Sequence, residues 1–406
     1  MLLKTYLGLA AVTLTPVSAF DFPSFAQTAI DSGLALAGLN SIALLNSFTH
    51  MKGTCNPANV KFRQEWRTLT PAERKRYISA VKCVQAKPTI LPPGQAPGSK
   101  SLFDDFGNFL TWHRYYIHVY EQKLQQCGYN GVLPYWEWGY DVNSLKDSPV
   151  FDGSDTSLGS DGKAIPHQGI QLTFPGVTTV LPLPPGTGGG CVHTGPFKDM
   201  VVHLGPVGLP QYGSTNSTSA ADPNQDNPRC LKRDLNPGVA KRYTTFRNTT
   251  ELILQKTNIK DFQGEFTGDP RTGTSNLLGV HGGGHFSMGG DPGSDPFISP
   301  GDPAFYLHHA QVDRVYWIWQ NLDFAARQNV WGYVLDPLLP QAARPPFPEE
   351  LPELPLLPTT FFMDLLPSPN TTVNDLVDLK PLTPTTRPIK ELMDTVGGSP
   401  FCYVYI

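Results

Sequence analysis

Apolar residues recur at helical spacing in several parts of the chain, and segments rich in proline and glycine separate these parts. Residues 28–51, rich in alanine and leucine, predict one helix. A second begins at Thr70, which can cap it, while Pro71 suits its first turn and Glu73 completes a capping box. Residues 244–256 predict a further helix of the core.

Residues 107–121, with the sequence G-N-F-L-T-W-H-R-Y-Y-I-H-V-Y-E, predict another helix. His118 follows His113 by five residues, which is about 500° around a helix, so it points away from His113 and is expected to be structural. The aromatic residues at helical spacing along this segment are expected in the core: Trp112, Tyr116 and Tyr120.

The segment from Gly279 to Gln320 holds four of the ten histidines. His281 and His285 stand at i and i+4, and therefore share one face of a helix. The tandem pair at 308 and 309 opens a second apolar, aromatic helix after a Gly/Pro/Asp loop. Asp313 lies four residues beyond the pair, placed to accept a hydrogen bond from an imidazole or to fix Arg314. Such a cluster predicts a nitrogen-rich metal site with a carboxylate behind it.

Other interpretations of this segment exist. A histidine pair at i and i+4 is more often solvated or capping than ligating. A zinc protease would need glutamate at position 282, which is Gly282 here. The three glycines between His281 and His285 each cost about 1 kcal/mol relative to alanine inside a helix. Their presence indicates close approach of backbone or ligand, and the pattern D-P-x-F-Y-L-H-H-x-x-x-D-R favours metal.

Residues 281–320 resemble the second copper-binding motif of the tyrosinases and catechol oxidases, the type-3 copper proteins. In that motif both histidines of H-x-x-x-H and the second histidine of the tandem pair bind copper. The resemblance therefore implies His281, His285 and His309 as ligands, with His308 as a neighbour that does not bind. Asp313 is the candidate for supporting the ligands from behind, and Arg314 is expected to pair with a nearby acid.

The sequence F-L-T-W-H-R resembles the end of the first copper motif of the same family and implies His113 as a ligand. Residues 133–138 resemble its P-Y-W-x-W segment, which packs the core. Residues 401–405, F-C-Y-V-Y, resemble the Tyr-x-Tyr motif that ends the catalytic core. The short secreted fungal group of the family is the nearest likeness, and no C-terminal shielding domain is expected after this motif.

The chain departs from the family's first motif. The family has two more histidines upstream, one of them nine positions before His113, where this chain has Asp104. No histidine lies between residues 51 and 112. Residues 102–106 resemble the segment before the first ligand and 107–109 the segment after the second, as though a piece had been removed between Phe106 and Gly107. A gene-model error, a splice variant and a degenerate site remain alternatives.

The 406 residues carry a net charge of −4, which gives no electrostatic reason to expect nucleic acid or an anionic membrane as partner. Only 16% of the residues are charged, whereas 40 prolines and 38 glycines indicate long ordered loops. Such loops are expected over residues 150–240 and in the proline-dense segment 335–358. Because residues 113 and 281–309 must converge, one domain over 20–406 is expected.

Residues 1–19 have the form of a secretory signal peptide, with Lys4, a short apolar stretch and a small-residue cleavage site at Val17-Ser18-Ala19. No later segment reaches the roughly 18 apolar residues of a membrane span. A secreted, extracellular protein is therefore expected. Its six cysteines allow up to three disulfides with any of 15 connectivities. Three sequons are glycosylation candidates: Asn216, Asn248 and Asn370.

The resemblance implies a mainly α fold, in which a four-helix-bundle core holds a dinuclear copper site, with long Pro/Gly-rich loops and few short strands. It implies an oxidoreductase that uses O2 to convert o-diphenols to o-quinones, with monophenols as alternative substrates. Gly282 stands where monophenol-active members often carry asparagine, which favours diphenol oxidation. Phe305 is a candidate ring-stacking wall of the substrate pocket, although core packing is the stronger explanation for any single aromatic residue. The rival expectation is a secreted copper-binding protein without turnover, because His113 is the only first-site ligand. A third expectation is a purely structural glycoprotein. His50 is expected to cap a helix or to lie exposed, and three others are expected to be solvated loop residues that do not bind metal: His167, His193 and His203.

Overall fold

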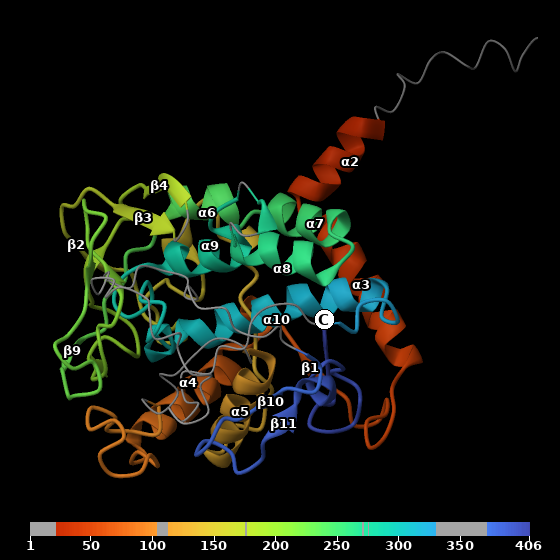
Figure 1. The fold of residues 1–406 in the computed structure, drawn as a ribbon, viewed down its shortest axis with the longest axis horizontal. Helices are drawn as coiled ribbons and strands as arrows, with labels where there is room; N and C mark the ends of the chain where they lie inside the picture. The colour runs from red at the N-terminus through yellow and green to blue at the C-terminus, as the bar shows by residue number, and fades with distance from the viewer. Residues whose placement is uncertain (1–21, 104–112, 175–176, 270–271, 275, 330–371) are drawn as a thin grey trace, which may run out of the picture.

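Helix α10 (Ala304–Leu322) runs through the middle of the molecule in the computed structural model, and other helices pack around it (Figure 1). These helices are α3 (Leu34–Thr49), α5 (His113–Gln126), α7 (Phe246–Gln255) and α9 (Gly279–Met288). The structure describes residues 22–103, 113–174, 177–269, 272–274, 276–329 and 372–406. The predictions for the signal peptide, Trp112, Asn370, the proline-dense segment and the Phe106–Gly107 junction lie outside these residues.

The mainly α fold with few short strands is confirmed. The other helices are α2 (Phe22–Asp31), α4 (Pro71–Ala86), α6 (Pro237–Tyr243) and α8 (Ile259–Thr267). Helix α4 has the predicted capping box, in which Thr70 and Glu73 each accept from the other's backbone N–H. Thr245 caps α7, so the helix predicted over 244–256 is confirmed as well.

The single helix predicted over 28–51 is broken in two. Gly33 has φ of 83°, a left-handed conformation that ends α2 and starts α3. A Cβ at this position would lie 2.8 Å from the ring of Phe246 on α7. The alanine and leucine pattern is therefore helical, but the glycine turns the chain so that α3 can pack along α10.

Short strands occupy the loop-rich middle and the chain end, always in two-stranded pairs among the described residues. The antiparallel pairs are β2 (Gly162–Ala164) with β5 (Gly189–Val192), β3 (Ile170–Phe174) with β4 (Val177–Leu183), β6 (Val201–Val202) with β9 (Arg229–Cys230), β7 (Leu209–Pro210) with β8 (Ser217–Thr218), and β10 (Leu376–Val377) with β11 (Arg387–Pro388). Strand β1 (Lys61–Arg63) pairs in parallel with β12 (Tyr403–Tyr405), so the Tyr-x-Tyr segment joins the helical core.

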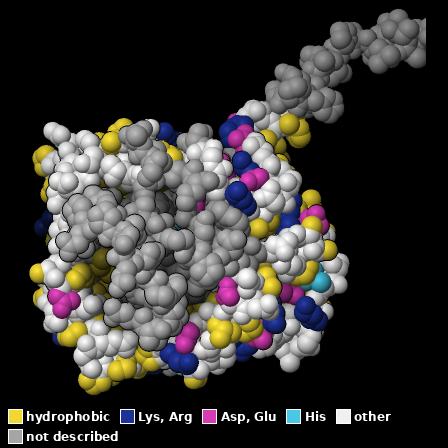
Figure 2. Space-filling model, in the orientation of Figure 1, with side chains coloured by type: hydrophobic (Ala, Val, Ile, Leu, Met, Phe, Trp, Pro, Cys, Tyr) yellow, Lys and Arg dark blue, Asp and Glu magenta, His cyan; other side chains and the backbone are white. Residues whose placement is uncertain are grey.

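On the face in Figure 2, basic and acidic side chains of the described residues are interspersed rather than gathered by sign, as the small net charge suggests. No single helix among the described residues is long and apolar enough to cross a membrane. One pair passes the same test of length and composition together, Phe25–Asp31 with Leu34–Thr49, and it is bent by 76°.

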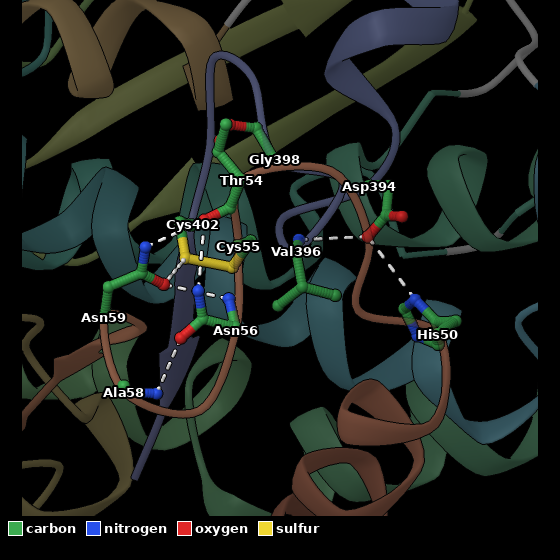
Figure 3. The surroundings of a disulfide bond; sticks show 10 residues. All are labelled: His50, Thr54, Cys55, Asn56, Ala58, Asn59, Asp394, Val396, Gly398 and Cys402. Carbon is green, nitrogen blue, oxygen red and sulfur yellow. Dashed lines mark hydrogen bonds and ion pairs between the residues drawn. A yellow bond between two sulfur atoms is a disulfide. The ribbon is translucent and has the colours of Figure 1, made fainter.

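All six cysteines form disulfides, as predicted, and the structure selects one connectivity: Cys55–Cys402, Cys83–Cys127 and Cys191–Cys230. The first joins positions 347 residues apart, beside the β1–β12 pair. Figure 3 shows its surroundings, where Thr54 donates to the backbone oxygen of Gly398 at 2.6 Å. These contacts tie the C-terminal segment to the loop that follows α3.

Candidate metal centre

Three histidines from two helices converge in the interior. His281 and His285 lie one turn apart on α9, and His309 faces them from α10. Their ring centroids are 4.9 Å (281–285), 5.1 Å (285–309) and 5.2 Å (281–309) apart. The Nε2 atoms of His285 and His309 are 3.0 Å apart, and both ring nitrogens of His281 are buried without a hydrogen-bond partner. Ring nitrogens of His285 and His309 thus meet in one small volume, beside the unpartnered nitrogens of His281.

The glycines of α9 allow this close packing. A Cβ at Gly284 would lie 2.2 Å from Cε1 of His308, and one at Gly283 would lie 2.4 Å from Cβ of Tyr243. Gly282 is buried, and a Cβ there would meet the side chain of Leu278 at 2.9 Å. Close approach is therefore the reason for glycine at 283 and 284. The expected place of Gly282 in the substrate pocket, where glycine would favour diphenols, stays a prediction.

His308 belongs to the same cluster. A nitrogen of each of His281, His285, His308 and His309 lies within 4.8 Å of the others. The indole N–H of Trp138 donates to Nδ1 of His308 at 3.1 Å, and His308 Nε2 is buried without a partner among the described residues. The resemblance had set His308 aside as a neighbour, and the structure brings it as close as the expected ligands.

His113 reaches the cluster from the first turn of α5. Its ring centroid lies 3.9 Å from that of His309 and 5.6 Å from that of His281. Phe305 lies beside the same rings, with its centroid 4.0 Å from His309 and 6.4 Å from His113. The structure thus brings together the four histidines predicted as ligands and the phenylalanine predicted as a wall.

Burial sets the protonation of the cluster. Desolvation lowers the pKa of His281 to about 4 and holds the pKa of His113, His285 and His309 well below the usual range. Neighbouring imidazoles lower the pKa of these last three further, because two cations so close would repel. At neutral pH the cluster is therefore uncharged, the form in which imidazole binds metal.

Asp313 lies one turn beyond His309. It was expected to accept a hydrogen bond from an imidazole or to fix Arg314, but in the described residues it does neither. Its carboxylate accepts from Arg114 Nε at 2.6 Å and from the hydroxyls of Tyr403 and Tyr405, each at 2.6 Å. Arg63 lies 3.4 Å away on the other side. These two guanidinium groups lower the pKa of the Asp313 carboxyl despite its burial. Asp313 therefore supports the centre indirectly, by joining α10 to α5, β1 and β12.

Arg314 pairs with a nearby acid, as predicted: its Nη1 lies 2.6 Å from Glu137 Oε2. Its Nε also donates to Asn40 on α3 at 3.0 Å. Since Glu137 directly precedes Trp138, this ion pair holds the Trp138 segment against α10. The role of Arg314 is thus to fix the backbone beside the histidine cluster.

The other five histidines have partners elsewhere in the described residues, and that they do not bind the metal stays a prediction. Histidines reach the centre from α5, α9 and α10, whereas His50 ends α3 and pairs with Asn321 (2.9 Å) and Asp394 (3.5 Å; Figure 3). His167 is not a solvated loop residue, because its side chain is buried against Asp234 at 3.3 Å. The remaining pairs are His118 with Gln122, His193 with Ser160 and His203 with Asp226.

The model of the common central domain of tyrosinase matches residues 85–322 of the chain. The chain belongs to the tyrosinase family. It is 35% identical over 388 residues to Tyrosinase P of Aspergillus terreus, covering 90% of this chain and 98% of that one. It is 38% identical over 291 residues to N-acetyl-6-hydroxytryptophan oxidase ivoB of Emericella nidulans, covering 66% and 76%. A polyphenol oxidase variant from Thermothelomyces thermophila superposes with a TM-score of 0.74 at 34% identity, covering 92% and 98%.

Tyrosinases imply copper, and the geometry can be tested for it. For an imidazole nitrogen about 2.0–2.1 Å from a metal ion, three rings at near-tetrahedral angles have centroids about 5 Å apart. The separations of 4.9–5.2 Å among His281, His285 and His309 fit one ion. For a second ion, His113 is the one remaining histidine that the tyrosinase resemblance assigns as a ligand. The residues therefore fit one copper ion well and leave the second with a single expected ligand.

Three residues of this tyrosinase centre were missed or underrated from the sequence. Trp138 had been assigned to core packing, although its indole N–H holds His308. Arg63 and Arg114 had no predicted role, although both contact Asp313. The only available signal was the position of Arg114 directly after His113, because charged residues within apolar segments generally have buried partners.

Proposed function

We propose that this chain binds copper through His281, His285 and His309 and acts with O2 on o-diphenols, giving o-quinones. The observation that carries the proposal is the near-equilateral arrangement of these three neutral imidazoles in a buried, aromatic site. Copper, when bound, would supply the electron transfer between the phenol and O2. The protein would hold the ligands neutral and exclude water.

Phe305 is the candidate for orienting the substrate ring. Its ring lies 4.0 Å from that of His309 and is almost fully buried. An aromatic face beside a ligand favours a flat phenol by offset or edge-to-face contact. Oxidation removes two electrons and two protons from each diphenol, and two diphenols reduce one O2 to two waters. With no carboxylate in the histidine group of the described residues, the phenol protons would leave through an imidazole or water.

The rate is expected to be low in the chain as written. Two ions with three imidazoles each require six, and the five histidines outside the centre all have other partners. Only five imidazoles converge, and only four belong to the set that the resemblance implies. Metal catalysis depends on fixed ligand geometry. The alternative function, favoured by the same count, is a copper-binding protein without turnover.

Copper content and oxygen uptake test these functions together. The purified chain is saturated with copper and dialysed, then the metal per chain and the O2 uptake with catechol are measured. About one copper with slow, copper-dependent uptake supports the proposal, and one copper without uptake supports the alternative. No retained copper would refute both. Hydroxylated indoles belong in the substrate panel, because one relative is named an N-acetyl-6-hydroxytryptophan oxidase.

We also propose secretion, with the mature chain beginning at Phe20 and a glycan on Asn216. Asn216 is exposed in the β7–β8 hairpin, whereas Asn248 lies within α7, where its side-chain amide donates to the backbone oxygen of Arg242 and Thr250 of its sequon is buried. Intact mass before and after glycosidase tests this. An unprocessed Met1, or a glycan on Asn248 alone, would contradict it.

A further inference from the structure

We propose that Trp138 determines which histidines of this centre can bind metal. Its indole N–H fixes His308 in the tautomer whose remaining nitrogen carries the proton, so His308 cannot become a fourth ligand and one coordination position stays open. The inference deepens the proposed function and rests on copper binding at His281, His285 and His309.

Position alone would make His308 a ligand. Its ring centroid lies 4.5 Å from His285, 4.8 Å from His309 and 5.7 Å from His281. With the three separations inside the triad, all six lie between 4.5 and 5.7 Å, which is close to a tetrahedron. Four imidazoles in this arrangement describe a closed site of the kind that holds a structural metal ion. Something other than distance must exclude His308 if the site is to stay open.

The hydrogen bond from Trp138 supplies that exclusion. An indole N–H can only donate, so Nδ1 of His308 must accept at 3.1 Å. A neutral imidazole has one acceptor nitrogen and one N–H, and an imidazolium has no acceptor. The proton of His308 therefore sits on Nε2, which has no lone pair to give to a metal ion. Nε2 is buried and has no partner among the described residues.

The surroundings keep this pair in place. Trp138 is fully buried at the start of a 3-10 turn (Trp138–Tyr140), and the preceding Glu137 is held by Arg314 on α10, the helix that carries His308. The imidazole lies directly on the backbone of Gly284, where even a Cβ would be 2.4 Å from Nδ1. Turning the ring to offer a nitrogen to the centre would leave the buried indole N–H without an acceptor, which is unfavourable.

The open position has a functional meaning. Structural metal sites are closed by four protein ligands, whereas catalytic sites keep three and leave a place for water or substrate. With His308 excluded, the triad of His281, His285 and His309 has the second form. Trp138 is thus a positioning residue, which acts on the metal through His308.

The test uses Cu(II) as the probe and the variants W138F, H308Q and the double variant W138F/H308Q. Copper affinity is measured by competition, and the nitrogens bound to Cu(II) are counted by pulsed electron paramagnetic resonance. W138F is expected to gain a fourth imidazole and to bind Cu(II) about tenfold or more tightly, since residues behind the ligands change metal affinity by about 10–100-fold. H308Q and the double variant are expected to keep three imidazoles.

The control for losing a buried tryptophan is W136F, because Trp136 donates to Asp141 at 2.7 Å and not to a histidine. W138F with three imidazoles and unchanged affinity would overturn this inference alone. No Cu(II) binding in the unmodified chain would overturn the proposed function as well. Should W138F fail to fold, nitrogen NMR of the metal-free, unmodified chain decides, because the inference requires the proton of His308 on Nε2. A proton on Nδ1 would refute it.

Discussion

The carboxylate of Asp313 accepts a hydrogen bond of 2.6 Å from Nε of Arg114, and this contact joins the two helices that carry His309 and His113. Arg114 directly follows His113 at the start of α5, and Asp313 lies one turn after His309 on α10. Both groups are buried, and the ring centroids of the two histidines are only 3.9 Å apart. The ion pair therefore fixes the distance between the two parts of the centre.

Asp313→Asn is expected to destabilise the fold strongly. The substitution leaves Arg114 and the fully buried Arg63 without their shared carboxylate, and breaking a buried ion pair in this way costs about 3–5 kcal/mol. The free energy of unfolding from urea titration measures the loss. Asp155→Asn is the control, because Asp155 and Lys75 form an exposed pair, for which the change should be below about 1 kcal/mol. Equal small losses would show that the Asp313 network does not stabilise the fold.

His285→Ala is expected to abolish the copper that is retained after dialysis, because it removes one of three imidazoles from the triad. His308→Ala should reduce it far less, since the proton on Nε2 already prevents binding. Copper per chain by elemental analysis measures both. Equal loss from the two variants would mean that the wrong member of the tandem pair has been assigned as a ligand.

The metal-free protein should lose stability as the pH falls from about 6.5 to about 4. Burial lowers the pKa of His281 and of His118 to about 4, whereas a histidine in the unfolded chain titrates near 6.5. In this window the unfolded chain binds protons that these native histidines do not, while Glu65, whose pKa burial raises to about 7, offsets about one of them. Each such histidine then lowers the free energy of unfolding by up to about 1.4 kcal/mol per pH unit as the pH decreases.

Urea titrations at several pH values measure this slope. His118→Gln should reduce the slope by the contribution of about one proton, which is about 1.4 kcal/mol per pH unit. It should not alter the metal centre, because His118 packs against Phe401 and lies outside the cluster. Carboxyl groups with lowered pKa, such as Asp313 and Glu121, add their loss mainly below about pH 4. A stability that stays constant from pH 6.5 to 4.5 would contradict the assignment of neutral, desolvated histidines.

The sequence predicted the features that depend on near neighbours in the chain. The capping box of α4 and the shared face of His281 and His285 follow from spacing alone, and the glycines between these histidines correctly indicated close approach. The partners of Asp313 could not be predicted, because Arg63 lies 250 residues away and reaches it only once β1 has paired with β12. Likewise, nothing local to His167 indicates that Asp234 covers it.

Gly284→Ala is expected to disturb the centre although position 284 carries no ligand. The added Cβ would lie 2.2 Å from Cε1 of His308, in a site where both the helix and the ring are buried. The ring must move, and the hydrogen bond from Trp138 would then lengthen or break. Copper affinity and the nitrogen count should change as in W138F, together with a loss of stability of about 1–3 kcal/mol from overpacking. Gly38→Ala, on the open side of α3, is the control, because no atom lies within 4 Å of its Cβ.

Inserting a segment with two histidines between Phe106 and Gly107 is expected to turn a one-copper protein into a two-copper oxidase. The chain as written offers His281, His285 and His309 to one ion and His113 to another, so two imidazoles are missing from a pair of three-imidazole sites. The family places its two further ligands upstream of His113, which is where the insertion restores them. Copper per chain should rise from about one to about two, and O2 uptake with catechol should rise by orders of magnitude, because catalysis needs both ions at fixed geometry.

The control is an insertion of the same length with glutamine in place of both histidines. It separates the effect of the ligands from that of the added chain length and should leave copper near one. Two coppers in the unmodified chain would contradict the argument, since His50, His118 or a loop histidine would then have been recruited to the second ion.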